Sequence, residues 1–139
     1  PYDQFVRAIL TATGTPADNP PVTWYRQVRT PQQNVDNVSQ LFLGTRIQCA
    51  QCHHHPFEKW SQDDYYSFAA FFARVGRKPF ENSDNGEPTE AVFVSRAGNV
   101  THPNTQAVMK PAGLDGPKLD LAAGVDPRAK LADWLTDPA

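Results

Sequence analysis

The densest grouping of chemically reactive side chains in this sequence is a pair of cysteines followed by a histidine. Cys49 and Cys52 stand three positions apart, and His53 comes directly after them. Cysteines at this spacing on a helical turn project from the same side, so both sulfurs can bond one edge of a porphyrin ring. The next residue then lies over the iron, where an imidazole is a good ligand. The pattern predicts one covalent haem c, with thioether bonds at Cys49 and Cys52 and His53 as the first axial ligand.

Two other chemistries are open to the same residues. Zinc bound by the cysteines and a neighbouring histidine would normally need a second pair of ligands at similar spacing, and the chain has only two cysteines. A redox-active dithiol usually opens a helix after a strand in a βαβ unit, whereas this pair is expected to close a helix. The pattern therefore favours haem over zinc and over a dithiol.

The sequence offers two candidates for the sixth iron ligand. Met109 is the single methionine, and its thioether would raise the reduction potential of a haem. His102 stands just before Pro103 and would give a bis-histidine iron of lower potential. An open or externally filled position is the third alternative, and the sequence does not choose among them.

Residues around the motif are candidates for a haem pocket, because a porphyrin is a large apolar plate that needs a dry surface. His55 is a candidate partner of a haem propionate or of a backbone carbonyl. Arg46 precedes Cys49 by one turn and could reach a propionate, although a solvated arginine is the simpler interpretation. The candidate ring contacts, for which an ordinary aromatic core is the alternative, are Phe57, Trp60, Tyr65 and Phe68.

The pattern of apolar residues, caps and breakers predicts a mainly α fold. Thr30 and Ser61 each begin a capping box, and Asp126 followed by Pro127 is typical of a helix start. Helices are expected over residues 1–13, 30–52 and 61–76 and from 126 onward. A strand over 90–95 should pair with the chain from Val100, and 77–89 should form a loop. We expect about four helices with a small β-hairpin and long Pro/Gly-rich loops, packed around one haem c.

Length and composition limit the function classes. The 139 residues are 40% hydrophobic and carry a formal net charge of −2, which fits a single globular domain over 1–139. This balanced charge gives no reason to expect a nucleic acid as partner. No apolar run approaches the ~20 residues that cross a bilayer, so we expect no membrane span in this chain.

A longer stretch resembles a known family. Residues 43–60 read LGTRIQCAQCHHHPFEKW, followed by QDDYY at 62–66 and AAFF at 69–72. These segments resemble the planctomycete-type cytochrome c domain, a family first catalogued as a domain of unknown function in large secreted planctomycete proteins. The resemblance implies haem attachment at Cys49 and Cys52, ligation by His53, and export to the periplasm or another extracytoplasmic space. It also implies that the chain was excised from a longer multidomain protein.

These observations lead to three functional hypotheses. The first is one-electron transfer in the periplasm, with a redox partner protein or an adjacent domain of the parent chain as partner. The second is an enzyme or small-ligand sensor with an open iron position. The third is an interaction module in which a metal or haem staples the fold. Electron transfer is favoured over catalysis.

Overall fold

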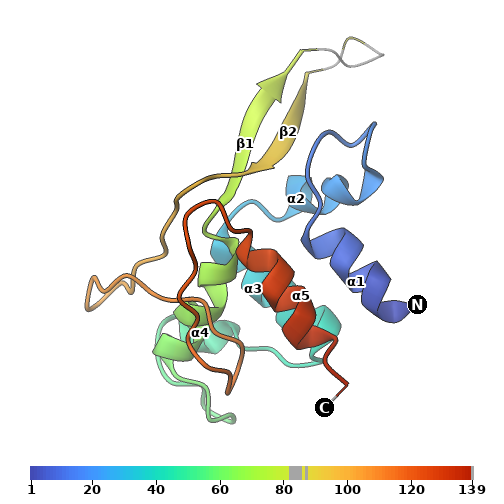
Figure 1. Cartoon of the computed structure of the whole chain (residues 1–139). Helices are drawn as coiled ribbons and strands as arrows, with labels where there is room; N and C mark the ends of the chain where they lie inside the picture. The colour runs from blue at the N-terminus through green and yellow to red at the C-terminus, as the bar shows by residue number, and fades with distance from the viewer. Residues whose placement is uncertain (82–85, 87, 139) are drawn as a thin grey trace.

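The structure is a computed structural model that describes residues 1–81, 86 and 88–138. Five α-helices, three short 3₁₀ helices and one two-stranded antiparallel sheet are formed by these residues (Figure 1). In chain order they are α1 (Tyr2–Leu10), η1 (Pro20–Thr23), α2 (Trp24–Gln27), α3 (Pro31–Phe42), η2 (Gln48–Gln51), α4 (Gln62–Ala69), η3 (Ala70–Phe72), β1 (Val75–Phe80), β2 (Thr89–Val94) and α5 (Pro127–Leu135).

The expectation of a mainly α domain of about four helices packed around a haem is wrong. The described residues form a small mixed α/β domain with five short α-helices and a sheet. Side chains fill its core, mainly the aromatic rings of α4 and η3 and apolar residues of α1, α3 and α5. Cys49 and Cys52 lie at the surface instead. Local sequence patterns indicated long helices, but they do not show where tertiary packing ends a helix early.

The starts of two helices follow the sequence closely. The Thr30 hydroxyl accepts a hydrogen bond from the backbone N–H of Gln33, and the Gln33 side chain reaches back to the Thr30 N–H. Ser61 and Asp64 make the same reciprocal pair at the start of α4. Each capping box satisfies backbone donors that a helix start would otherwise leave unpaired.

The helix expected over 30–52 is two separate elements. α3 ends at Phe42, and the backbone N–H groups of Leu43 and Thr45 both bond the Ser39 carbonyl. Gly44 then adopts a φ of +66°, a left-handed conformation that suits glycine and ends a helix. Cys49 therefore lies in the short η2 turn, Cys52 caps the end of that turn, and neither belongs to the end of a long helix.

The hairpin partner of residues 90–95 was wrongly predicted. β2 pairs with β1, in a register that places Val75 opposite Val94 and Phe80 opposite Thr89. β1 is polar and contains Gly76 and Pro79, so its sequence alone does not indicate a strand. The strand forms because it pairs with β2. Residues 77–80 were expected in the 77–89 loop, of which residues 82–85 and 87 lie outside the described part of the chain. Val75 and Gly76 were expected in the helix over 61–76, which is instead α4 followed by η3 and ends at Phe72.

The chain does not turn back at 97–99, because it packs against the end of η3 there. A Cβ on Gly98 would lie 2.2 Å from the Ala73 carbonyl oxygen, so the two backbones are in direct contact. Val100 does return in a narrow loop, but its partner is Met109, whose N–H donates to the Val100 carbonyl. No helix among residues 1–81, 86 and 88–138 is both long and apolar enough to span a membrane.

One buried cation ties the two ends of the chain together. Arg128 is 1% exposed and donates to the Asp126 carboxylate and to the Ala12 carbonyl, each at 3.0 Å. Its guanidinium also lies over the Tyr25 ring, 5.1 Å from the centroid. Charge, hydrogen bonds and ring contact together offset the cost of burying this side chain.

We predict that Arg128→Met lowers the free energy of unfolding by about 3 kcal/mol, because the Asp126 charge and the Ala12 carbonyl lose their buried partner. Urea denaturation followed by circular dichroism measures the change. Lys130→Met is the matched control, since Lys130 is exposed on the same helix. Equal midpoints for the two variants would contradict the structural role given to Arg128.

Candidate functional site

Both cysteines lie on a short surface turn that is attached to the domain by buried neighbouring residues. Ile47 and Ala50 are fully buried, whereas Cys49 and Cys52 are exposed and not joined in a disulfide. A 3₁₀ helix has three residues per turn, so residues at i and i+3 eclipse one another. The Cys52 N–H bonds the Cys49 carbonyl, so this turn continues to Cys52, and the two cysteines project from the same side. The apolar residues between and before them hold the turn to the domain.

The ring of His53 is oriented by a backbone carbonyl. Its Nδ1 lies 2.6 Å from the carbonyl oxygen of His54. A carbonyl can only accept, so Nδ1 carries a proton, and in the neutral ring Nε2 then keeps its lone pair. Histidines that bind metals are commonly held in this way, with the other ring nitrogen donating to a carbonyl. His53 is exposed, so its Nε2 is accessible to a ligand from outside the fold.

His55 uses both ring nitrogens to shape the loop that follows the motif. Its Nε2 donates to the Arg46 carbonyl at 2.7 Å. Its Nδ1 accepts from the backbone N–H groups of Phe57 and Glu58, at 3.3 and 3.0 Å. The ring is therefore neutral and connects the chain before η2 to the chain after it. This places His55 on a backbone carbonyl, one of the two roles expected for it.

The aromatic candidates divide into two groups. Phe57 is 92% exposed, and Trp60 is half-buried with the Lys59 ammonium 5.0 Å from its ring centroid. Tyr65 and Phe68 are fully buried in the core. Only the first pair could touch a group attached at the surface. Tyr65 bonds Asp36, and the Phe68 ring meets those of Phe71 and Trp134 in the core. The Arg46 side chain is exposed.

Both candidates for a sixth ligand are engaged elsewhere. His102 is 5% exposed; its Nδ1 accepts from the N–H groups of Asn104 and Thr105, and its Nε2 lies 3.4 Å from Asp63 Oδ1. Met109 is 8% exposed and packs in the core cluster. His102 would have to leave Asp63, and Met109 would have to leave the core, before either could bind an iron.

A glutamine that sequence reasoning missed connects the motif to the His102 loop. The Gln62 amide donates to the Gln51 carbonyl at 2.8 Å and accepts from the Asn104 amide at 2.9 Å. The 102–106 loop is therefore held beside η2, although about fifty residues separate them in the chain. No local pattern marks this bridge, because Gln62 reads as an ordinary first residue of a helix.

The donor set fits a covalent haem better than a bare metal ion. Among the residues that the structure describes, no three His, Cys, Asp or Glu side chains form a group that could hold a metal. Structural zinc needs four ligands and catalytic zinc three. A haem c would need two sulfurs for the porphyrin edge and one imidazole for the iron, because the porphyrin itself supplies four iron ligands. The two free thiols and the oriented His53 ring meet that need.

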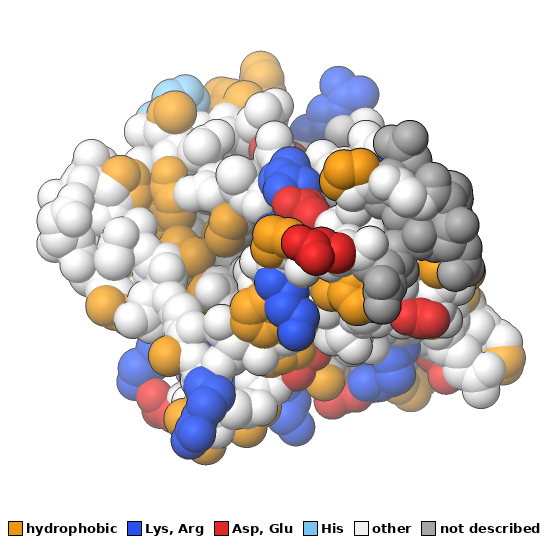
Figure 2. Space-filling model, turned by 90° about the horizontal axis from the view of Figure 1, so that it is seen from above, with side chains coloured by type: hydrophobic (Ala, Val, Ile, Leu, Met, Phe, Trp, Pro, Cys, Tyr) orange, Lys and Arg blue, Asp and Glu red, His pale blue; other side chains and the backbone are white. Residues whose placement is uncertain are grey.

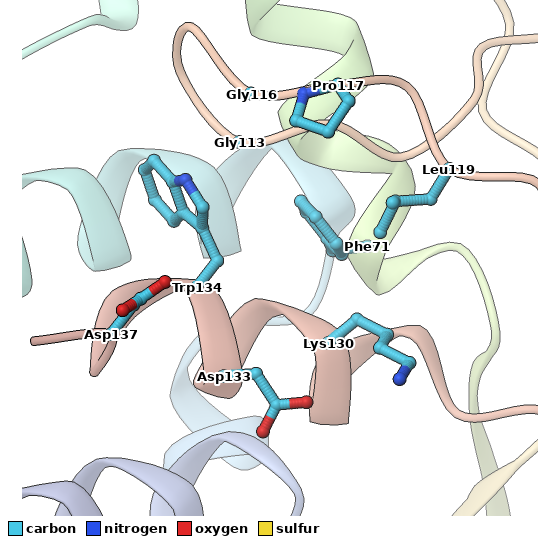
Figure 3. A pocket seen from close by; sticks show the side chains of 9 residues that line it. All are labelled: Phe71, Gly113, Gly116, Pro117, Leu119, Lys130, Asp133, Trp134 and Asp137. Atoms are coloured by element: carbon cyan, nitrogen blue, oxygen red, sulfur yellow. The ribbon is translucent and has the colours of Figure 1, made fainter. Parts of the chain in front are cut away.

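A separate cavity lies between α5 and the 111–119 loop. It has a volume of about 340 Å³, and Figure 3 shows the rings of Trp134 and Phe71 beside it, with Lys130 and Asp133 on the α5 side. A Cβ on Gly113 would lie 2.4 Å from the Trp134 indole, so the loop backbone packs directly on that ring. None of its lining residues belongs to the 43–60 segment, so this cavity is not part of the cysteine site.

We predict that His55→Ala destabilises the loop after the motif. Three backbone groups lose a hydrogen-bond partner, which should lower the free energy of unfolding by about 1–2 kcal/mol. It should also speed amide hydrogen exchange at Phe57 and Glu58. Hydrogen exchange by NMR and urea denaturation measure the two effects. His54→Ala is the control, because that side chain is exposed; equally fast exchange at Phe57 and Glu58 in both variants would contradict the role of the His55 ring.

Comparison with known proteins gives one match. The family named PSCyt2, described as a protein of unknown function (DUF1549), matches residues 1–77, which include η2, the His55 loop and α4. No curated protein and no solved structure matches the chain. Since the matched region covers more than half of the 139 residues, the chain belongs to the PSCyt2 family of proteins of unknown function.

Proposed function

We propose that this domain binds one haem c through thioether bonds at Cys49 and Cys52, with His53 as axial ligand, and that it transfers single electrons. The observation that carries the proposal is the arrangement of η2. Two exposed, unpaired thiols share one side of a turn, and the next residue is an imidazole whose Nδ1 donates to the His54 carbonyl. This combination suits a haem that is bonded twice and ligated once by the same segment.

The chain's own residues contribute attachment, orientation and support. Ile47 and Ala50 anchor the turn, and the His54 carbonyl fixes the His53 tautomer. His55 holds the loop that carries Phe57, the exposed ring nearest to the motif in sequence. A bound haem c would supply a one-electron iron couple, whose potential depends on the axial ligands and on burial.

The partner and the location belong to the same proposal. We infer an extracytoplasmic, periplasmic domain of a longer chain, which exchanges electrons with an adjacent domain or a separate redox protein. The support is the resemblance of residues 43–72 to a secreted cytochrome family. In Figure 2, basic and acidic side chains are mixed over the face shown, which suits a protein partner better than a polyanion.

One observation favours a second function, in which the sixth iron position is open to a small ligand. The His102 ring is engaged at both nitrogens, and Met109 is packed in the core. If neither side chain leaves its place, an attached haem would be five-coordinate or would take a ligand from outside. Such a domain would act as a sensor or as an enzyme on a small molecule such as peroxide.

We expect the chain, produced with a cytochrome c maturation system, to gain the mass of one haem and to show a Soret band. Replacing either Cys49 or Cys52 by Ala should leave one thioether bond, and replacing both should abolish covalent attachment. His54→Ala is the control, because it leaves the motif intact. Intact-mass spectrometry and visible spectra measure these outcomes. A colourless wild-type protein of unmodified mass would overturn the proposal.

We expect the two functions to separate on iron spin state. Low-spin bands in both oxidation states that disappear in His102→Ala or Met109→Ala would identify that residue as sixth ligand and support electron transfer. High-spin bands that shift on addition of carbon monoxide or cyanide, and that are alike in both variants, would support the open site. Urea denaturation of each variant shows whether a spectral change comes only from unfolding.

A further inference from the structure

We propose that Tyr65 and Asp36 form a proton-coupled oxidation site, in which Tyr65 loses one electron to a strong oxidant at the Cys52 position while its phenolic proton passes to Asp36. The inference deepens the proposed function and rests on its open-site form for the natural oxidant, because a haem attached at Cys52 with an open iron position is the group that would take the electron. The pair itself belongs to the protein whether or not haem is bound.

The geometry of the pair provides a route for the proton. Tyr65, from α4, is fully buried, and its hydroxyl donates to Asp36 Oδ1, from α3, at 3.0 Å. Direct proton transfer needs heavy atoms about 2.6–3.2 Å apart, and this hydrogen bond lies within that range. The other acceptor near the hydroxyl, the Gln32 carbonyl, is 3.4 Å away. Asp36 is therefore the preferred acceptor.

Burial raises the pKa values of both Asp36 and Tyr65. Loss of water raises the pKa of the Asp36 carboxyl, which makes its carboxylate a better proton acceptor than an exposed one. Burial also raises the pKa of Tyr65, with Asp36 adding to the effect, so the phenol keeps its proton until it is oxidised. The proton therefore moves only when the electron leaves.

Aromatic contacts extend from this pair toward the other side of α4. The rings of Tyr65 and Tyr66 meet edge to face with centroids 5.2 Å apart, and the Tyr66 and His102 rings are 5.7 Å apart. After burial, the charge of Cys52 is the next influence that raises the pKa of Tyr66, and it acts on Tyr65 as well. The η2 turn, which is capped by Cys52, packs against α4, which carries both phenols.

The chemical step balances without a further reactant. The Tyr65 phenol and the Asp36 carboxylate become a neutral phenoxyl radical and a carboxylic acid, and the oxidant gains one electron. Reduction of the radical by a donor returns the proton to the Tyr65 oxygen. The oxidant must be a high-potential one-electron oxidant. A haem that has reacted with peroxide belongs to this class, whereas a resting ferric haem is too weak.

A buried tyrosine elsewhere in the fold provides a matched comparison. Tyr25 is also fully buried, but its hydroxyl donates to the backbone carbonyl of Leu10. A carbonyl cannot hold a transferred proton at ordinary pH, so Tyr25 lacks the acceptor that Tyr65 has. The proposal therefore predicts different behaviour for two phenols of equal burial.

The test uses a ruthenium tris-bipyridyl label on the exposed Cys52 thiol of the haem-free Cys49→Ser protein. Flash oxidation of the label should produce a phenoxyl radical, seen by transient absorption and EPR, and Tyr65→Phe should remove most of it. Asp36→Asn should slow its formation at least about tenfold, since a positioned base contributes a factor of this order or more. Tyr25→Phe should change neither yield nor rate.

A second measurement uses the labelled Cys49→Ser protein without further substitutions, so it does not depend on whether the Tyr65 and Asp36 variants fold. Radical formation should be slower in D₂O than in H₂O, because proton transfer accompanies electron loss. A radical that persists in Tyr65→Phe, or a rate that is unaffected by both Asp36→Asn and D₂O, would overturn the inference. Because the label replaces haem as oxidant, the result is independent of whether the domain binds haem.

Discussion

The seating of the η2 turn on the domain is the constraint on which the rest of the site depends. A four-residue 3₁₀ helix is not stable alone, because the free energy needed to nucleate a helix exceeds what its few hydrogen bonds contribute. Ile47 and Ala50 are buried beneath η2, and the Gln62 amide of α4 bonds its Gln51 carbonyl. The cysteines and His53 are therefore positioned by the core, although they themselves face water.

Two residues of α4, one turn apart, contribute to this site in different ways. Gln62, at the start of the helix, makes a structural bridge between η2 and the His102 loop. Tyr65, one turn later, is buried and bonded to the Asp36 carboxylate. The proposed attachment and ligation thus fall on an exposed segment, whereas the proposed proton-coupled chemistry falls in the interior. Both proposals draw on one helix, whose first turn is fixed by the Ser61 and Asp64 capping box.

Local signals in the sequence predicted local structure, and contacts between distant residues escaped them. The caps at Thr30 and Ser61 were predictable because each depends on residues three positions apart. The motif of Cys49, Cys52 and His53 is also visible from spacing alone, and its haem-binding role stays a prediction. The β1 strand and the engagement of His102 by Asp63 depend on pairings across the chain, as does the bond between Tyr65 and Asp36. No periodicity or cap encodes such pairings, so only the folded chain shows them.

The exposure of Cys49 and Cys52 would affect the speed of electron exchange by a haem bound there. A prosthetic ring bonded to Cys49 and Cys52 would keep at least one edge in water, because these residues lie on the surface. Solvent dipoles would reorient around that edge whenever the iron changed charge, which raises the reorganisation energy. A docked partner that displaces this water would lower it. Contact with the correct partner would then accelerate transfer without any change in the iron ligands.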